Sequence, residues 1–234
     1  LQNGLNQHQH HQNNMGAFGG PDIITDGLVL ALDAGSERSY PGTGTSWYDL
    51  SGSGYTHSLI DSPTYAVVDG VACFAMTGNS YAKPTSSTYT LPTNFTYTGW
   101  ARILADSQTP NWRTLWRPDP SDHVILVQDA TNLIGFYDND SGGFQSYGLN
   151  VGTMGIENVW TLYTVVTSSG TSTLYINDNE YSGSVSYTAA GNTHEKIGYP
   201  AQGFGEVANT MIYNRALTTA EISQNYNAQK NRFI

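Results

Sequence analysis

Short apolar segments alternate with polar ones along most of this chain and end at turn residues. Residues 95–103 show the pattern well, because every second side chain of an extended strand points to the same side. One side of this strand carries most of the apolar residues: Phe95, Tyr97, Ala101 and Ile103. Residues 160–166 alternate in the same way, and Asn177 starts a hairpin turn before the next β-rich segment. Short strands separated by turn residues in this way predict a β-sandwich.

One helix is predicted near the C-terminus, over about residues 219–231. Thr218 stands at its N-cap and Glu221 follows three residues later, which is the spacing of a capping box. Leu217 and Ile222 occupy the two positions of a hydrophobic staple, which fixes the angle at which the chain enters the helix. No other segment of the chain predicts a helix.

Four sequence segments carry a resemblance to a known family. They are Gly27-Leu-Val-Leu-Ala-Leu-Asp-Ala-Gly with the Ser39–Gly52 segment that follows it, Phe95–Arg102, Trp160–Val166 with Thr173–Asp178, and Ile212-Tyr-Asn-Arg-Ala-Leu with Glu221-Ile and Asn225-Tyr-Asn. Together they resemble laminin-G-like, concanavalin A-type jelly-roll domains, in the version common in tailed-phage virion proteins. The resemblance implies an all-β, concanavalin A-like antiparallel β-sandwich (jelly roll). With the capped C-terminal segment and the amide-rich start of the chain, the expected fold is this sandwich with one short C-terminal helix and an extended N-terminal arm.

The chain divides at about residue 20 into an arm, residues 1–20, and the sandwich, residues 21–234. Eleven of the first fourteen residues are Asn, Gln or His, so the arm has too few apolar groups to order itself. We therefore expect it to lie along a neighbouring subunit, as an extended backbone supported by its side chains. The arm residues expected to contact that partner are Gln7, His8, Gln9, His10, Gln12 and Phe18. A metal site at His8, His10 and His11 is the weaker alternative, because no carboxylate or thiol stands beside them.

Charge is sparse and mostly negative, with 9 Lys and Arg residues against 19 Asp and Glu residues and a net charge of −10. An acidic chain without basic clusters argues against nucleic acid and against an anionic membrane as partners. No apolar segment approaches the length of a membrane span. The single cysteine, Cys73, lies in an apolar strand and is expected to be buried.

The family that this chain resembles includes glycoside hydrolases, so the sequence has to be searched for catalytic carboxylates. Those enzymes need two carboxyl groups on either side of the scissile bond. The two glutamates closest in sequence are Glu195 and Glu206, eleven residues apart, so no strand carries a pair. We expect no catalytic residues, although carboxylates from distant loops could still meet.

The resemblance also implies one calcium ion at the rim of the sandwich. The candidate ligands are Asp119, Asp122 and Asp138, which would act with backbone carbonyls. The alternative is that these aspartates only form turns, as Asp does readily. No other cofactor is expected.

Carbohydrate binding remains as a chemical option. Exposed aromatic rings edged with amides bind sugars, and two segments near loops supply them. The candidate residues are Trp112, Trp116, Phe144 and Tyr147. The alternative is that Trp112 and Trp116 are strand residues packed in the core.

Three functions follow from these observations. The first is a non-enzymatic structural protein on the surface of a virion, a capsid decoration or appendage subunit anchored by its arm to other virion proteins or to copies of itself. The second is a carbohydrate-binding adhesion module, within a tail fibre or an extracellular or cell-surface protein, whose partner is a host-surface glycan. The third is a glycan-degrading enzyme, which needs two carboxylates in one groove.

Overall fold

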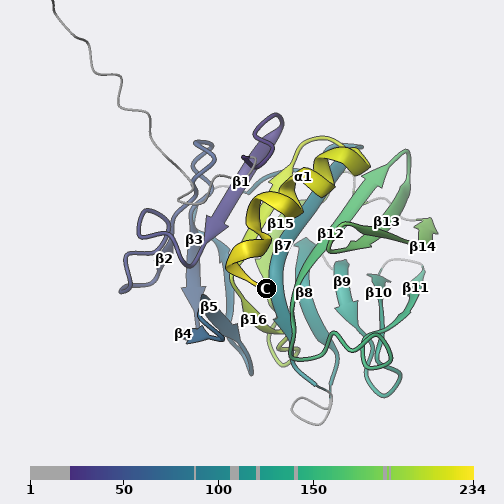
Figure 1. Ribbon diagram of the computed structural model, residues 1–234, viewed down its shortest axis with the longest axis horizontal. Helices are drawn as coiled ribbons and strands as arrows, with labels where there is room; N and C mark the ends of the chain where they lie inside the picture. Colours follow the sequence, from purple (N-terminus) through teal and green to yellow (C-terminus); the bar gives the residue numbers. More distant parts are fainter. Residues whose placement is uncertain are drawn as a thin grey trace, which may run out of the picture.

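The computed structural model describes residues 22–86, 88–105, 111–119, 122–139, 142–186, 189 and 191–234. Within these residues two antiparallel sheets pack face to face, and one α-helix lies over one of them (Figure 1). The predicted antiparallel β-sandwich with a short C-terminal helix is confirmed.

The nine-stranded sheet contains the long central strands. Its order is β14-β13-β12-β7-β16-β5-β4, and β17 pairs with both β7 and β1. Its strands are β1 (Leu28–Asp33), β4 (Thr64–Val68), β5 (Val71–Met76), β7 (Phe95–Ile103), β12 (Trp160–Ser168), β13 (Thr171–Ile176), β14 (Asn179–Ser186), β16 (Gly205–Val207) and β17 (Asn209–Tyr213).

The eight-stranded sheet faces it across the core. Its order is β11-β10-β9-β8-β15-β6-β3-β2. Its strands are β2 (Ser46–Trp47), β3 (His57–Ile60), β6 (Tyr81–Pro84), β8 (Arg113–Asp119), β9 (His123–Val127), β10 (Leu133–Asp138), β11 (Gly143–Asn150) and β15 (Thr193–Ile197).

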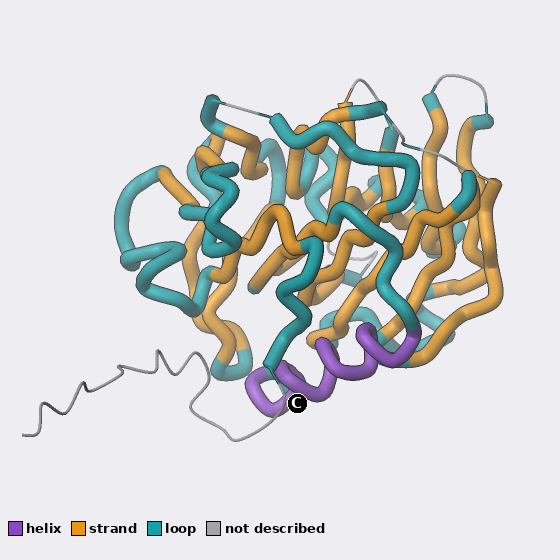
Figure 2. The backbone as a smooth tube through the Cα atoms, turned by 90° about the horizontal axis from the view of Figure 1, so that it is seen from above, coloured by secondary structure: helices purple, strands orange, loops and turns teal. Residues whose placement is uncertain are grey.

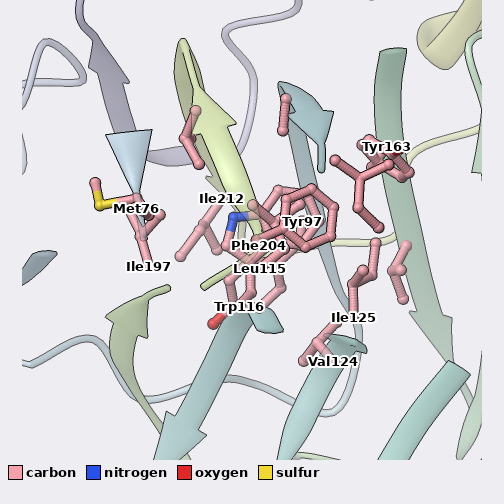
Figure 3. Close-up of a cluster of buried hydrophobic side chains, with 14 of the residues drawn as sticks. Met76, Tyr97, Leu115, Trp116, Val124, Ile125, Tyr163, Ile197, Phe204 and Ile212 are labelled. Atoms are coloured by element: carbon pink, nitrogen blue, oxygen red, sulfur yellow. The ribbon is translucent and has the colours of Figure 1, made fainter. Parts of the chain in front are cut away.

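The main core lies between the two sheets and takes the inward side chains of both (Figure 3). Tyr97 on β7 and Tyr163 on β12 enter it from the nine-stranded sheet, and Trp116 on β8 enters it from the other. The alternation predicted along residues 95–103 is confirmed, because its apolar side belongs to this cluster. Cys73 is fully buried, as expected for a small apolar residue.

The outer side of the nine-stranded sheet is covered as well. The helix α1 (Thr219–Gln229) and the short 3-10 turn η1 (Lys230–Arg232) lie over it (Figure 2). Trp100 on this side of β7 stacks on Phe233, with ring centroids 4.2 Å apart and planes 3° apart. Alternation alone did not predict that β7 is buried on both faces.

The start of α1 has the predicted capping box. The Thr218 side chain accepts a hydrogen bond from the Glu221 amide, and the Glu221 carboxylate accepts one from the Thr218 amide at 2.8 Å. Leu217 and Ile222 are buried in one cluster, so the staple is confirmed as well. No helix in the described part of the chain has the length and apolar character that crossing a membrane requires.

Two histidines and a tyrosine form a hydrogen-bonded chain inside the core. His57 Nδ1 lies 2.8 Å from the Tyr55 carbonyl, which can only accept, so Nδ1 carries the proton and Nε2 does not. His194 Nε2 therefore donates to His57 Nε2 at 2.9 Å, and the Tyr97 hydroxyl donates to His194 Nδ1 at 3.0 Å. Burial lowers the pKa of His57 to about 4 and the pKa of His194 well below its usual range. Both rings are consequently neutral near pH 7.

Candidate functional site

Aromatic side chains gather on the outer face of the eight-stranded sheet, the face turned away from the core. Phe144 on β11, Tyr137 on β10 and Trp112 just before β8 are each partly exposed. The Trp112 ring meets the other two edge to face, with ring centroids 5.5 Å from Tyr137 and 5.5 Å from Phe144. Partly exposed rings in this arrangement form a firm apolar platform.

A glycine makes room for the platform. A Cβ at Gly135 on β10 would lie 2.5 Å from Phe144 Cε2 and 2.5 Å from the Gln145 carbonyl oxygen. Real Cβ atoms do not approach other atoms so closely, so any larger residue would displace the ring or the strand. The position of Phe144 on the sheet therefore depends on Gly135.

His123, the first residue of β9, connects the platform to the middle of the sheet. Its ring centroid lies 6.2 Å from that of Tyr137 and 5.4 Å from that of Tyr199. The Thr114 hydroxyl donates to Gln202 Oε1 at 2.7 Å, so in its 2.9 Å contact with His123 Nδ1 the histidine is the donor. This tautomer leaves His123 Nε2 as a hydrogen-bond acceptor.

The charge state of His123 agrees with its role as a hydrogen-bond acceptor. Burial, together with the positive charges of Arg117 and Lys196, lowers the pKa of His123 to about 3. The ring is therefore neutral at pH 7, because the protonated form would be both desolvated and repelled.

Two cations continue the surface on β8 and β15. Arg117 and Lys196 face each other across these strands, and each forms an ion pair with Glu195. Both also approach the Tyr199 ring, with Arg117 Cζ 4.5 Å and Lys196 Nζ 5.8 Å from its centroid. Lys196 Nζ lies 5.6 Å from the ring centroid of Tyr81 on β6. Such cation–π contacts hold long side chains in place.

These side chains form one continuous surface, which we call the outer row. Its members are Tyr81, Trp112, Arg117, His123, Tyr137, Phe144, Glu195, Lys196 and Tyr199. It runs across the sheet from β11 to β6. Rings with a few fixed donors and acceptors among them are typical of sites for small ligands. The rings suit the apolar faces of sugars, and the polar groups suit hydroxyls.

The structure brings together two of the four aromatic residues predicted to bind carbohydrate. Trp112 and Phe144 belong to the outer row, whereas Trp116 and Tyr147 are buried in the core with 0% and 2% of their surface exposed. The prediction of an exposed ring is therefore corrected for these two, which cannot reach a ligand on the surface.

The reason lies in the strands. Trp112 and Trp116 are an even number of residues apart and would share a side of a regular strand. A bulge between Thr114 and Trp116 shifts the register of β8 against β9, so Trp116 turns inward and Arg117 turns outward. On β11, Tyr147 lies an odd number of residues from Phe144 and takes the inner side.

The three aspartates predicted to bind calcium lie at the same end of three neighbouring strands of the eight-stranded sheet. Asp119 ends β8, Asp138 ends β10, and Asp122 immediately precedes β9. The Asp122 carboxylate accepts hydrogen bonds from the Asn139 amide at 3.2 Å and from Asn192 Nδ2 at 2.7 Å, which is the turn-forming role. Among the described residues no three His, Cys, Asp or Glu side chains form a group able to hold a metal ion. Calcium binding stays a prediction.

The residues predicted to anchor the arm lie outside the described part of the chain. They are Gln7, His8, Gln9, His10, Gln12 and Phe18. The described chain begins at Asp22 beside α1, where the Asp22 carbonyl accepts from Gln224 Nε2 at 2.8 Å and the Ile24 amide donates to Asn225 Oδ1 at 2.8 Å.

Sequence reasoning missed the cationic half of the outer row. Tyr81, Arg117 and Lys196 come from three segments far apart in sequence, and Tyr199 comes from the loop after β15. The available signal was the alternation of Tyr81 and Lys83 about the buried Ala82, which predicts two outward side chains on one strand.

Comparison with known proteins places this geometry in context. Residues 76–223 match a family model described as the concanavalin A-like lectin/glucanases superfamily. No match was found among curated proteins.

Several solved structures share the fold. The binding domain of Paraclostridial Mosquitocidal Protein 1 aligns with a TM-score of 0.64 at 18% identity, over 88% of this chain and 53% of that one. The binding domain of botulinum neurotoxin DC in complex with rat synaptotagmin II aligns with a TM-score of 0.66 at 14% identity, over 88% and 52%. Trypanosoma rangeli sialidase in complex with sialic acid aligns with a TM-score of 0.58 at 14% identity, over 88% and 33%. The chain thus spans about half the length of the two toxin domains and a third of the sialidase.

Proposed function

We propose that this chain, which belongs to the concanavalin A-like lectin/glucanases superfamily, binds carbohydrate through the outer row. The observation that carries the proposal is the contact of the Trp112 ring with the rings of Tyr137 and Phe144, all three of them partly exposed. Partly exposed aromatic rings on a domain surface are costly to leave in water and favour a partner. Beside them, the hydroxyls of the partly exposed Tyr137 and Tyr199 supply polar contacts to a sugar ring.

Two of the similar structures support this proposal by their fold. One is a sialidase in complex with sialic acid, and the other is the binding domain of botulinum neurotoxin DC in complex with SialylT. The match of more than half of the chain to a lectin and glucanase superfamily supports it as well.

The proposal is binding without catalysis. Within the outer row the one described carboxylate is that of Glu195, which is paired with Arg117 and Lys196. A glycosidase needs two carboxyl groups on either side of the scissile bond, and the described part of the outer row supplies one.

The test is a glycan array probed with the wild-type chain and with Trp112→Ala. We expect sugar binding by the wild type and at least about a tenfold loss in the variant, since truncating an aromatic anchor typically costs 2 kcal/mol or more. Tyr48→Ala is the matched control, because that ring is 46% exposed and lies outside the outer row. An array without hits, or equal binding by Trp112→Ala and the wild type, would overturn the proposal.

A second candidate is a structural subunit of a phage-like virion, located on the virion surface. The observation that favours it is the uncharged, amide-rich composition of residues 1–20. Deleting residues 1–20 should abolish co-assembly with the native particle and leave sugar binding unchanged, because Asp22 contacts α1 rather than the outer row. Co-assembly that survives the deletion contradicts this role for the arm.

A further inference from the structure

Three cations lie on three adjacent strands of the eight-stranded sheet. The order β8-β15-β6 puts Arg117, Lys196 and Lys83 on consecutive strands. Arg117 pairs with Lys196 across β8 and β15, and Ile197 pairs with Ala82 across β15 and β6. Because that ladder is antiparallel, Lys83 stands opposite Lys196 one residue further along. Lys83 follows the buried Ala82 and is exposed, so it shares the outer face with the other two.

The charge of this corner is opposite to that of the chain. The whole sequence has 9 basic and 19 acidic residues, yet three of the nine basic ones meet here. Among the described side chains of the corner, one carboxylate, Glu195, balances them. Lys83 forms no ion pair within the described part of the chain, so its ammonium group faces solvent.

Two of the cations are held in place before any ligand arrives. The side chains of Arg117 and Lys196 are only 11% and 12% exposed, and each rests against the Tyr199 ring. Lys196 also lies beside Tyr81. Cations that are already desolvated and ordered lose little conformational entropy when they meet an anion.

We propose that this corner makes the outer row a binding surface for acidic saccharides, which carry a carboxylate or a sulfate group. The inference rests on the proposed function. The Tyr81 and Tyr199 rings receive the apolar face of the sugar, while Lys83 and Lys196 bind its anionic group. Binding a neutral sugar would desolvate these ammonium groups without forming an interaction strong enough to offset that cost. An anion forms charge-assisted hydrogen bonds with them and does offset it. The aromatic rings favour a saccharide over a bare phosphate or an acidic peptide, since neither has an apolar ring face.

The experiment uses an array of matched pairs: uronate oligosaccharides with their carboxyl-reduced counterparts, sialylated glycans with desialylated ones, and sulfated glycans with desulfated ones. Polyglutamate and inorganic phosphate are included as competitors. We expect the acidic member of at least one class to bind about tenfold more tightly than its neutral counterpart. The class that does so distinguishes carboxylate from sulfate recognition.

The variant is Lys83→Gln with Lys196→Gln, and the matched control is Lys230→Gln, which makes a single charge change on the opposite face of the sandwich. In the double variant the acidic and neutral members should bind within about twofold of each other, with thermal stability monitored to confirm folding. Equal binding of acidic and neutral members by the wild type overturns this inference and leaves the proposed function standing. Competition by polyglutamate as strong as that by an acidic saccharide overturns the claim that the ligand is a saccharide. An array with no hits overturns the proposed function itself and this inference with it.

Discussion

The chain of His57, His194 and Tyr97 shows how single protons are fixed in this core. The Tyr55 carbonyl can only accept a hydrogen bond, so the proton of His57 lies on Nδ1. It follows that the proton of His194 lies on Nε2 and that the Tyr97 hydroxyl donates to His194 Nδ1. A second proton on His57 would sit on Nε2 and place two N–H groups against each other at the 2.9 Å contact between the histidines, whereas a second proton on His194 would sit on Nδ1, the nitrogen that accepts from the Tyr97 hydroxyl. The buried arrangement is therefore stable only while both imidazoles are neutral.

This arrangement predicts that acid weakens the fold. In the unfolded chain His57 takes up a proton near pH 6.5, whereas in the folded chain it stays neutral until about pH 4. Between these values the unfolded state binds more protons, so the free energy of unfolding falls as pH drops from about 6.5 to about 4. The shift corresponds to roughly 3 kcal/mol from His57. Urea unfolding at pH 7, 6, 5 and 4 measures this decrease in the free energy of unfolding.

The control is His57→Gln, whose amide can donate to the Tyr55 carbonyl and accept from His194 without titrating. The variant should lose less stability than the wild type over the same pH range. Parallel curves for the two proteins would show that His57 does not contribute.

At the scale of strands and helices, alternation predicted the inward side wherever the strand is regular. The inner side of β7 and the capping box of α1 follow from local sequence alone. The side chain of Trp116 could not be placed in this way, because a bulge is set by pairing with β9 and leaves no mark in the sequence of β8.

The outer row was only partly predictable for a similar reason. Trp112 and Phe144 were found as aromatic residues near loops, but their contact depends on the order of strands in the sheet. Arg117 and Lys196 meet because β8 pairs with β15, which lies more than seventy residues away in the chain. Such long-range pairing is decided by the whole sandwich.

The C-terminal segment predicts a sharp contrast between two neighbouring residues. Phe233 is 7% exposed and stacks on Trp100, so Phe233→Ala should lower the free energy of unfolding by about 3 kcal/mol. Ile234 is 69% exposed, so Ile234→Ala should change it by less than about 0.5 kcal/mol. Denaturant unfolding compares the two variants. Equal effects would mean that the stacked ring is not what holds the end of the chain against the sheet.

At the scale of the whole molecule, the strand β4 lies at an edge of the nine-stranded sheet. β4 ends the order of the nine-stranded sheet, and it exposes Tyr65 and Val67, the latter by 66%. An edge strand with exposed apolar side chains and no charge is prone to pair with another copy.

The prediction is that Val67→Lys reduces self-association at high protein concentration, measured by light scattering. The thermal midpoint of this variant should stay within about 2 °C of the wild-type value, since an exposed substitution changes the free energy of unfolding by at most about 0.5 kcal/mol. Ile234→Lys makes the same charge change away from this edge and should leave association unchanged. Equal association of the wild type and Val67→Lys would contradict a role for β4.

The two ends of the described chain lie on the same side of the sandwich. Asp22 is hydrogen-bonded to Gln224 of α1, and Phe233 packs on Trp100 beneath the same helix. The outer row lies on the opposite sheet and faces away from both ends. A carrier that holds many copies by either end therefore points every row outward. If the outer row binds sugar as proposed, each further copy would bind at high effective concentration, and avidity would convert weak binding of one sugar into strong adhesion to a glycan-coated surface.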